Sequence, residues 1–335
     1  MIAVLMGGVS SEREVSLKSG TAIFDCLKDA GYAVVSVDAG RNVAEILMKV
    51  NPDVAIIALH GGWGENGSIQ GLLELLSIPY TGSGVLASAL AMNKYMSKVV
   101  FIERGINVPP FVLLDKEAFN EEPDMISGLT GSAGAQQGTH FAHRPESWEE
   151  PWPKPWIVKP CGEGSSIGIH IVRNDLQYRE ATADAFSYGG KVLVERFIPG
   201  KEIHVGILRN KVLGSVEVRP TGEFYDYRSK YTTGCTRYVL PPEVDEVSLK
   251  SVEETALMAH KAIGSEGVTR VDTILSEQGE VYVLEVNTLP GMTNTSLIPK
   301  IAARAGYSFL TLVEEMLSDA LAQTGCVQTQ SLINR

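Results

Sequence analysis

The sequence lacks the features that mark several common classes of protein. Its four cysteines are far apart and form no CxxC pair, so neither a zinc site nor a disulfide framework is indicated. Acidic residues outnumber basic ones by 40 to 29, which argues against a nucleic-acid groove as the main site. No apolar run reaches the roughly 18 residues of a membrane helix, and the N-terminus lacks a basic segment followed by an apolar one. We therefore expect a cytoplasmic protein that binds neither membranes nor nucleic acid.

The composition is otherwise that of an ordinary globular protein, with 44% apolar and 21% charged residues in 335. This length allows roughly two or three domains. Over about the first eighty residues, short apolar segments alternate with amphipathic ones, which predicts a parallel sheet covered by helices on both faces. Ligands of such sheets bind beyond the carboxyl ends of strands, so "GGVSSERE" and "HGGWGENG" are candidate site segments. A long helix, "GVLASALAMNKYMSKVVFIERG", is expected next.

The pattern changes twice in the rest of the chain. From about residue 120 to 154, Gly, Pro, Ser and Gln dominate without any period, which predicts a flexible insertion. Later, "KVLVERFI", "KEIHVGIL" and "KVLGSVEVR" follow one another as consecutive strands. Consecutive strands indicate antiparallel sheets, so the expected fold class passes from α/β to α+β along the chain.

A hairpin near the C-terminus carries the most informative polar residues. In "TRVDTILSEQGEVYVLEVN" two strands flank a short turn at 276–279, and pairing about it places Asp272 opposite Glu285. Arg270 shares the face of Asp272, and Asn287 shares that of Glu285. Alternation along the second strand predicts one face for Val281, Val283, Glu285 and Asn287. All-oxygen ligands suit Mg²⁺ with nucleotide phosphates completing its shell, whereas the alternative is an ion-paired solvent face.

Phosphate donors are available in "VKPCGEGSSIGIHIV". Lys159 ends a strand there, and the glycines and serines after it allow backbone N–H groups to approach phosphate oxygens. The segment is not a Walker A loop, because the GK[ST] ending is missing, and its glycine spacing is one residue too long for GxGxxG. By itself such a loop is more often only a turn, but the hairpin carboxylates favour a phosphate site.

Three further residues are weaker candidates. In "VLVERFIPGKEIHV", a strand edge after Glu195 could receive an adenine, with Glu202 near the ribose. His60, which ends "AIIALH", is equally well interpreted as a core histidine or as a substrate contact.

Taken together, these segments resemble the ATP-grasp carboxylate–amine ligases, and the match narrows to the D-alanine–D-alanine ligase family. The resemblance covers nearly the whole chain, in order and approximate spacing, through "GGVSSEREVSLKSG", "ALHGGWGENGSIQG", "PYTGSGVLASALAMNKYMSK", "IVKPCGEGSSIG", "FYDYRSKY", "TRVDTIL" and "LEVNTLPGMTNTSL". Residues 120–154 match poorly. Trp63 and Asn66 stand where the family usually has smaller or acidic residues, which could change the entrance of the substrate pocket.

The resemblance implies an ATP-grasp fold. Its parts would be an N-terminal parallel α/β substrate domain (1–86), a central domain (87–190, containing the insertion) and a C-terminal catalytic domain (191–335), with the last two clamping ATP. It also implies ATP and two Mg²⁺ (or Mn²⁺) as cofactors, D-alanine as the other small-molecule substrate, and a homodimer.

Roles for single residues follow from the same resemblance. ATP would be bound by Lys94, Lys159, Glu195, Arg196, Phe197, Ile198, Glu202 and Lys230, and Mg²⁺ by Asp272, Glu285 and Asn287. The D-alanine molecules would contact Glu12, His60, Ser296 and Leu297. Arg270 and the N–H of Gly291 would stabilise oxyanion charge. Glu12, Ser165 and Tyr231 would form a hydrogen-bonded set that fastens "TGEFYDYRSKYTTGCTRY" as a lid.

The implied reaction is ATP-dependent ligation of two D-alanine molecules through an acyl phosphate, for peptidoglycan precursor synthesis. Two alternatives stay open at this point. One is an ATP-grasp ligase that joins different amino acids, and the other is a nucleotide-binding regulator that has lost turnover. The presence of Glu12, Ser165, Arg270 and all three predicted metal ligands argues against the regulator.

Overall fold

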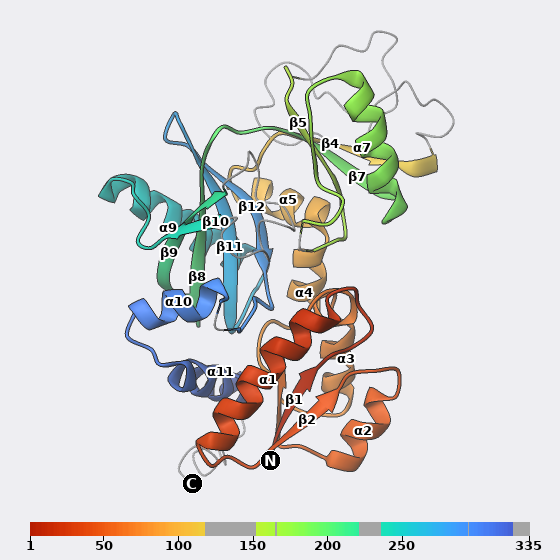
Figure 1. Cartoon of the computed structure of the whole chain (residues 1–335), viewed down its shortest axis with the longest axis vertical. Helices are drawn as coiled ribbons and strands as arrows, with labels where there is room; N and C mark the ends of the chain where they lie inside the picture. Colours follow the sequence, from red (N-terminus) through yellow and green to blue (C-terminus); the bar gives the residue numbers. More distant parts are fainter. Residues whose placement is uncertain (118–151, 165, 221–235, 294, 324–335) are drawn as a thin grey trace.

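The computed structural model describes residues 1–117, 152–164, 166–220, 236–293 and 295–323, which build three sheets (Figure 1). Their strand orders are β2-β1-β3, β4-β7-β5-β6 and β10-β9-β8-β11-β12. The first sheet is parallel and the other two are antiparallel. The predicted change from α/β to α+β is therefore confirmed.

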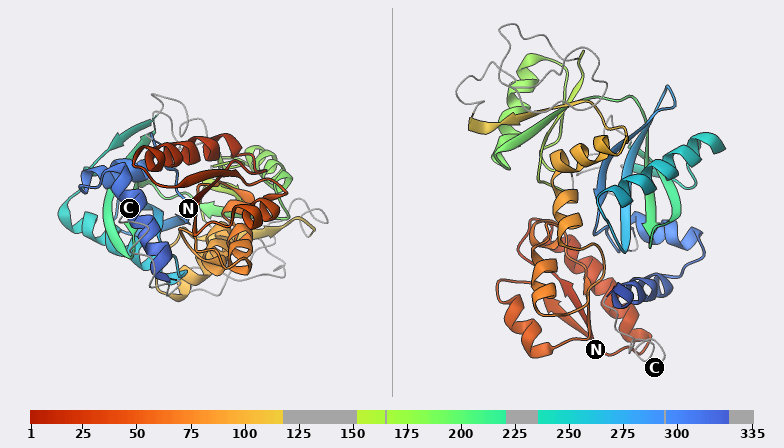
Figure 2. Two further views of the ribbon diagram at one scale, coloured as in Figure 1. Left: turned by 90° about the horizontal axis from the view of Figure 1, so that it is seen from below. Right: turned by 180° about the vertical axis from the view of Figure 1, so that it is seen from behind.

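The N-terminal sheet contains β1 (Ile2–Met6), β2 (Val34–Asp38) and β3 (Val54–Ile57), with helices on both faces. Helices α2 (Val43–Val50) and α3 (Ser68–Leu75) cover one face, and the short helix η1 (Gly62–Gly64) precedes α3. The other face is covered by α1 (Arg13–Asp29) and by α11 (Phe309–Gln323) near the C-terminus. Figures 1 and 2 show α11 beside α1. A parallel sheet must bury both of its faces, and α11 helps α1 to cover the second face.

The predicted long helix is wrong, because two helices occupy its place. These are α4 (Val85–Met92) and α5 (Lys94–Glu103), which meet at an angle of 104°. Asn93 between them is extended, and its side chain accepts a hydrogen bond from Met96 N, so it caps α5. Figure 2 shows the pair running from the N-terminal part toward the other two sheets. In the described part of the chain no single helix has the length and apolarity to cross a membrane, and only this bent pair has them jointly.

The central sheet contains β4 (Phe111–Asp115), β5 (Trp156–Pro160), β6 (His170–Val172) and β7 (Lys191–Arg196). Helix α7 (Asp175–Ser187) packs on it. The predicted boundary at residue 190 would separate β7 from this sheet, so sheet membership extends the central part to Arg196. The predicted flexible insertion lies almost entirely outside the described residues.

The five-stranded sheet contains β8 (Gly200–Leu208), β9 (Lys211–Pro220), β10 (Thr236–Val239), β11 (Val268–Ser276) and β12 (Val281–Asn287). Helix α9 (Glu246–Ala262) packs on one face through Val252, Ala256 and Ala259. Helix α10 (Leu297–Arg304) packs on part of the opposite face. The remainder of that opposite face carries the polar residues described next.

Candidate active site

The hairpin formed by β11 and β12 has the predicted register. Asp272 pairs with Glu285, and Arg270 pairs with Asn287. The next pair is Thr273 with Val283, so Leu284 is an extra residue and forms a β-bulge. Because of this bulge, the predicted common face is wrong.

The bulge divides the second strand between two environments. Val281 and Val283 belong to the apolar core under α9, together with Val286. Glu285 and Asn287 are only half-buried and join Arg270 and Asp272 on the opposite face. If Leu284 were paired regularly and formed no bulge, strict alternation would place Glu285 on the apolar side of the sheet with Val281 and Val283. The predicted grouping of an arginine, two carboxylates and an amide is thus confirmed, and the bulge produces it.

Asp272 is the most enclosed member of this group, being only 3% exposed. Arg270 donates to both of its oxygens, from Nε at 2.7 Å and from Nη2 at 2.8 Å. Asn287 Nδ2 donates to Oδ2 at 3.1 Å, which fixes the direction of the amide. Glu285 Oε2 lies 3.4 Å from Lys94 Nζ. Each carboxylate therefore has a cation beside it.

The donor types on this face fit a hard divalent cation. Two carboxylates and an amide oxygen come from adjacent strands, and Mg²⁺ is usually held by one or two carboxylates with substrate phosphates. Among the described residues, no three His, Cys, Asp or Glu side chains gather closely enough to hold a metal alone. The set therefore suits a metal that arrives with a phosphate ligand.

A buried cluster of two lysines and one glutamate lies between β5, β7 and α5. Glu195 Oε1 lies 2.9 Å from Lys159 Nζ and 3.0 Å from Lys98 Nζ. Burial raises the pKa of Glu195, but the two lysine charges outweigh burial and the net pKa is lowered. Burial lowers the pKa of Lys98 to about 8. The side chain of Glu195 thus faces Lys98 and Lys159, and its predicted contact with ATP stays a prediction.

Sequence reasoning missed Lys98, although it stands in the quoted segment "MNKYMSK" beside Lys94. Lys94 begins α5, and its Nζ donates to the carbonyl oxygen of Glu163. It therefore joins the glycine-rich segment after β5 to Glu285 on β12. Because the helix breaks at Asn93, α5 begins with Lys94 between Glu163 and Glu285.

Glu12 reaches the same region from the N-terminal part. A Cβ atom built on Gly61 would lie 2.7 Å from Glu12 Oε2, and one on Gly164 would lie 3.2 Å from it. The carboxylate therefore passes between two glycines of different parts of the chain. Gly164 directly precedes Ser165, the predicted partner of Glu12, but Ser165 lies outside the described residues, as do Lys230 and Tyr231.

A second carboxyl, which the sequence analysis did not single out, lies beside Glu12. Glu65 Oε2 accepts a hydrogen bond from Gly61 N at 3.1 Å. Burial, and next the charge of Glu12, raise the pKa of Glu65. Its position in "HGGWGENG", beside the noted Trp63 and Asn66, was the available signal.

The predicted adenine and ribose residues follow β7 and enter β8. Arg196 is exposed, Phe197 is half-buried and Ile198 is buried. Glu202 is half-buried, and its Oε1 lies 2.7 Å from Nε2 of His204. This segment joins the central sheet to the five-stranded sheet. Both β7 and β8 are interior strands, and Glu202 pairs with Val218 on one side and Ile274 on the other, so the predicted strand edge is wrong at Glu202.

The segment after β12 forms a tight polar turn before α10. Ser296 Oγ accepts a hydrogen bond from Thr293 N at 3.1 Å. A Cβ atom on Gly291 would lie 2.7 Å from Ser296 Oγ, so these two predicted site residues adjoin. Leu297 is the first residue of α10 and is buried.

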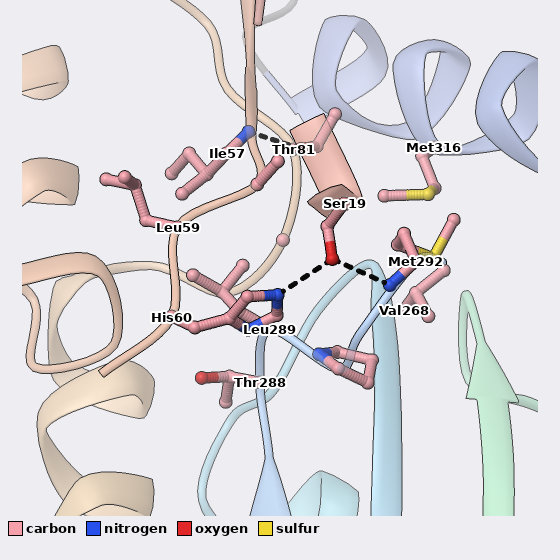
Figure 3. A pocket seen from close by; sticks show the side chains of 13 residues that line it. Ser19, Ile57, Leu59, His60, Thr81, Val268, Thr288, Leu289, Met292 and Met316 are labelled. Atoms are coloured by element: carbon pink, nitrogen blue, oxygen red, sulfur yellow. Dashed lines mark hydrogen bonds between the residues drawn. The ribbon is translucent and has the colours of Figure 1, made fainter. Parts of the chain in front are cut away.

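His60 lies behind the site, at the junction of the N-terminal part with the turn after β12 (Figure 3). Its Nε2 lies 3.1 Å from Ser19 Oγ, and that hydroxyl accepts a hydrogen bond from Met292 N at 3.3 Å. The mainly apolar cavity beside it, of about 20 Å³, has room for about one water molecule. Burial lowers the pKa of His60 to about 4. A substrate contact by His60 stays a prediction.

The sequence and the fold were compared with known proteins. Residues 100–318 match the family model described as "D-ala D-ala ligase C-terminus", and residues 39–83 match "D-ala D-ala ligase N-terminus". The chain is 46% identical over 319 residues to a D-alanine–D-alanine ligase of Anaeromyxobacter dehalogenans, covering 95% of this chain and 96% of that one.

Two solved structures are also similar. A D-alanine–D-alanine ligase of Bacillus anthracis complexed with ATP has a TM-score of 0.76 at 31% identity, covering 97% of both chains. The VanG D-Ala:D-Ser ligase of Enterococcus faecalis has a TM-score of 0.76 at 26% identity, covering 95% of this chain and 98% of that one.

Proposed function

Because this chain belongs to the D-alanine–D-alanine ligase family, we propose that it joins two D-alanine molecules in an ATP-dependent, ADP-forming reaction of peptidoglycan precursor synthesis. The observation that carries the proposal is the polar face formed by Arg270, Asp272, Glu285 and Asn287, with Lys94 beside it. This face provides metal-type oxygens and cationic charge together, as transfer of a phosphoryl group requires. The three sheets of the protein are the substrate, central and catalytic parts of an ATP-grasp arrangement.

In this proposal Asp272, Glu285 and Asn287 would hold two Mg²⁺ (or Mn²⁺), which would neutralise charge on the triphosphate. Lys94 and Lys159 contact its phosphate oxygens. Arg196, Phe197 and Ile198 line the adenine, and Glu202 accepts from the ribose hydroxyls. Glu195 orients Lys159 through the 2.9 Å ion pair between them.

The two amino acids bind on the N-terminal side of this face. Glu12 holds the ammonium group of the first D-alanine, whose carboxylate attacks the γ-phosphate. The bond from this phosphate to the β-phosphate breaks, which gives an acyl phosphate and ADP. The neutral amine of the second D-alanine, bound at Ser296 and Leu297, then attacks the acyl carbon and phosphate leaves. Arg270 and the N–H of Gly291 stabilise the oxyanion. The proximity of Gly291 to Ser296 supports a shared subsite.

Closure of the site completes the proposal. The acyl phosphate reacts with water, so the site must exclude water before chemistry begins. By their sequence match, Ser165 and Tyr231 would form a hydrogen-bonded set with Glu12 that fastens the lid, and Lys230 would contact ATP. We also assign the protein to the cytoplasm and to a homodimer, again from the family match.

The alternative is a ligase of the same fold that joins a different second substrate. One similar structure carries the name of a D-Ala:D-Ser ligase, and Trp63, 43% exposed here, stands at a position of the family pattern where it is unusual. The test is ADP release with ATP, Mg²⁺ and D-alanine, compared with D-alanine plus D-serine, D-lactate, and L-alanine alone. We expect D-alanine alone to give ADP, phosphate and the dipeptide. Equal turnover with L-alanine, or none with any amino acid, would contradict the proposal.

A further inference from the structure

A buried histidine lies on the polar face of the five-stranded sheet and has no part in the proposed chemistry. His204, on β8, is 0% exposed. Its neighbours across the sheet are Val216 on β9 and Asp272 on β11, and Asp272 in turn pairs with Glu285. The imidazole therefore continues the row of side chains that contains the predicted metal ligands.

Both ring nitrogens of His204 face carboxylates. Nε2 lies 2.7 Å from Oε1 of Glu202, and Nδ1 lies 3.3 Å from Oδ1 of Asp272. Glu202 precedes His204 by two residues on the same strand, so the two side chains share a face. The ring thereby connects a predicted ribose ligand to a predicted metal ligand, two groups that come from different strands.

The contacts of His204 differ from those of a histidine that only fills a core. His260, also 0% exposed, offers the comparison, because its Nδ1 lies 2.8 Å from a neutral hydroxyl, Oγ1 of Thr269. The guanidinium of Arg270 already donates a hydrogen bond to each oxygen of Asp272. His204 Nδ1 approaches the same Oδ1 from the neighbouring strand, at 3.3 Å, so the ring adds a second contact to a carboxylate that Arg270 already orients.

We propose that His204 is a positioning residue that ties the carboxylate of Asp272 to that of Glu202 and so couples divalent-metal binding to nucleotide binding. The proposal rests on the roles given above to Asp272 and Glu202. Groups that orient a metal ligand typically change metal affinity about 10- to 100-fold when removed. Loss of the ring should therefore weaken the Mg²⁺ site and also make it insensitive to changes at Glu202.

The test measures binding of ADP by calorimetry, with and without Mg²⁺, so that no turnover is needed. In His204→Leu we expect the strengthening of ADP binding by Mg²⁺ to fall by about 10-fold or more. In steady-state assays the Mg²⁺ activation constant and KM for ATP should rise, while KM for D-alanine stays unchanged. Circular dichroism and thermal melting verify that the variant is folded.

Two conservative variants separate the two contacts. Asn at this position places its amide near the position of Nδ1, whereas Gln places it near that of Nε2. His204→Asn should therefore retain most of the Mg²⁺ affinity, and His204→Gln should retain the contact with Glu202 only. These variants also carry the test if His204→Leu does not fold. A double-mutant cycle completes it: Glu202→Gln should shift the Mg²⁺ dependence in the wild-type background but not in the His204→Leu background.

Two controls separate failure of this inference from failure of the proposed function. His260→Leu removes a buried histidine away from the acids and should lower stability without changing the Mg²⁺ effect. Asp272→Asn should abolish the Mg²⁺ effect whatever the role of His204. If Asp272→Asn leaves it unchanged, the proposed metal site is wrong. If Asp272→Asn abolishes it while His204→Leu binds ADP and Mg²⁺ as the wild type does, the inference about His204 is overturned.

Discussion

Lys98 Nζ lies 3.0 Å from Oε1 of Glu195, and both side chains are at most 2% exposed. The same oxygen lies 2.9 Å from Nζ of Lys159. Lys98 Nζ also lies 5.6 Å from the ring centre of Phe111. A carboxylate held between two ammonium groups leaves the cluster with one net positive charge. We interpret Lys98 as the group that fixes Glu195, so that Glu195 can orient Lys159.

Lys98→Met should therefore weaken both the fold and nucleotide binding. Removing one partner of a buried ion pair typically costs 3–5 kcal/mol, and we expect about 3 kcal/mol because Lys159 still pairs with Glu195. Denaturant unfolding measures this loss. KM for ATP should rise more than KM for D-alanine. The double variant Lys98→Met/Glu195→Gln should be less destabilised than the sum of its parts. Additive losses would show that the pair is not coupled.

The sequence predicted the parts of the site that depend on local pattern. The short turn at 276–279 sets the hairpin register, so the pairing of Asp272 with Glu285 could be derived from the chain alone. The bulge at Leu284 could not, because a strand pattern does not reveal which residue is left without a partner. Nor could the break at Asn93, since the residues on both sides are good helix formers.

Three ionisable residues of the site region were missed for a different reason. Lys98, Glu65 and His204 look like ordinary polar residues in the sequence, where a charge usually indicates a solvated surface. Only the fold shows that each lies against a charged group from a distant segment. Helix α11 likewise joins the N-terminal core through a contact that no local pattern contains.

Gly291→Ala should reduce activity through Ser296. The added Cβ atom would lie 2.7 Å from Ser296 Oγ, so the hydroxyl must move. Because Ser296 is proposed to bind the second D-alanine, we expect KM for the second D-alanine to rise several-fold with little change in KM for ATP. Gly189→Ala is the matched control, since a Cβ there meets no atom within 4 Å. Equal effects of the two substitutions on D-alanine kinetics would contradict this assignment.

His260 should make the fold sensitive to acid. Burial lowers its pKa from 6.5 to about 4, so below pH 6.5 the unfolded chain takes up a proton that the folded chain does not. Stability is therefore lost as the pH falls, by roughly 2 kcal/mol between pH 7 and pH 5 from this residue. His260→Asn keeps an amide near Thr269 and cannot titrate. Its free energy of unfolding should lie below that of the wild type at pH 7, with the difference shrinking toward pH 5. A constant difference would contradict the burial argument.

Glu285→Gln should abolish turnover without unfolding the protein. The side chain is half-buried and its Oε2 lies 3.4 Å from Lys94 Nζ, which keeps its bond to the carbonyl of Glu163 in the variant. Stability should therefore change little. Removing one carboxylate from the proposed Mg²⁺ site forfeits several kcal/mol of charge stabilisation, which corresponds to a loss in kcat of about 100-fold or more.

The measurement is kcat as a function of Mg²⁺ concentration, with Glu280→Gln as the control. Glu280 is an acid of the same hairpin that accepts a hydrogen bond from Tyr282 at 2.6 Å, away from the predicted ligands, and its replacement should leave kcat unchanged. A near-normal rate of Glu285→Gln at saturating Mg²⁺ would show that the acids of this hairpin are not metal ligands, and the polar face would then bind phosphate through its cations alone.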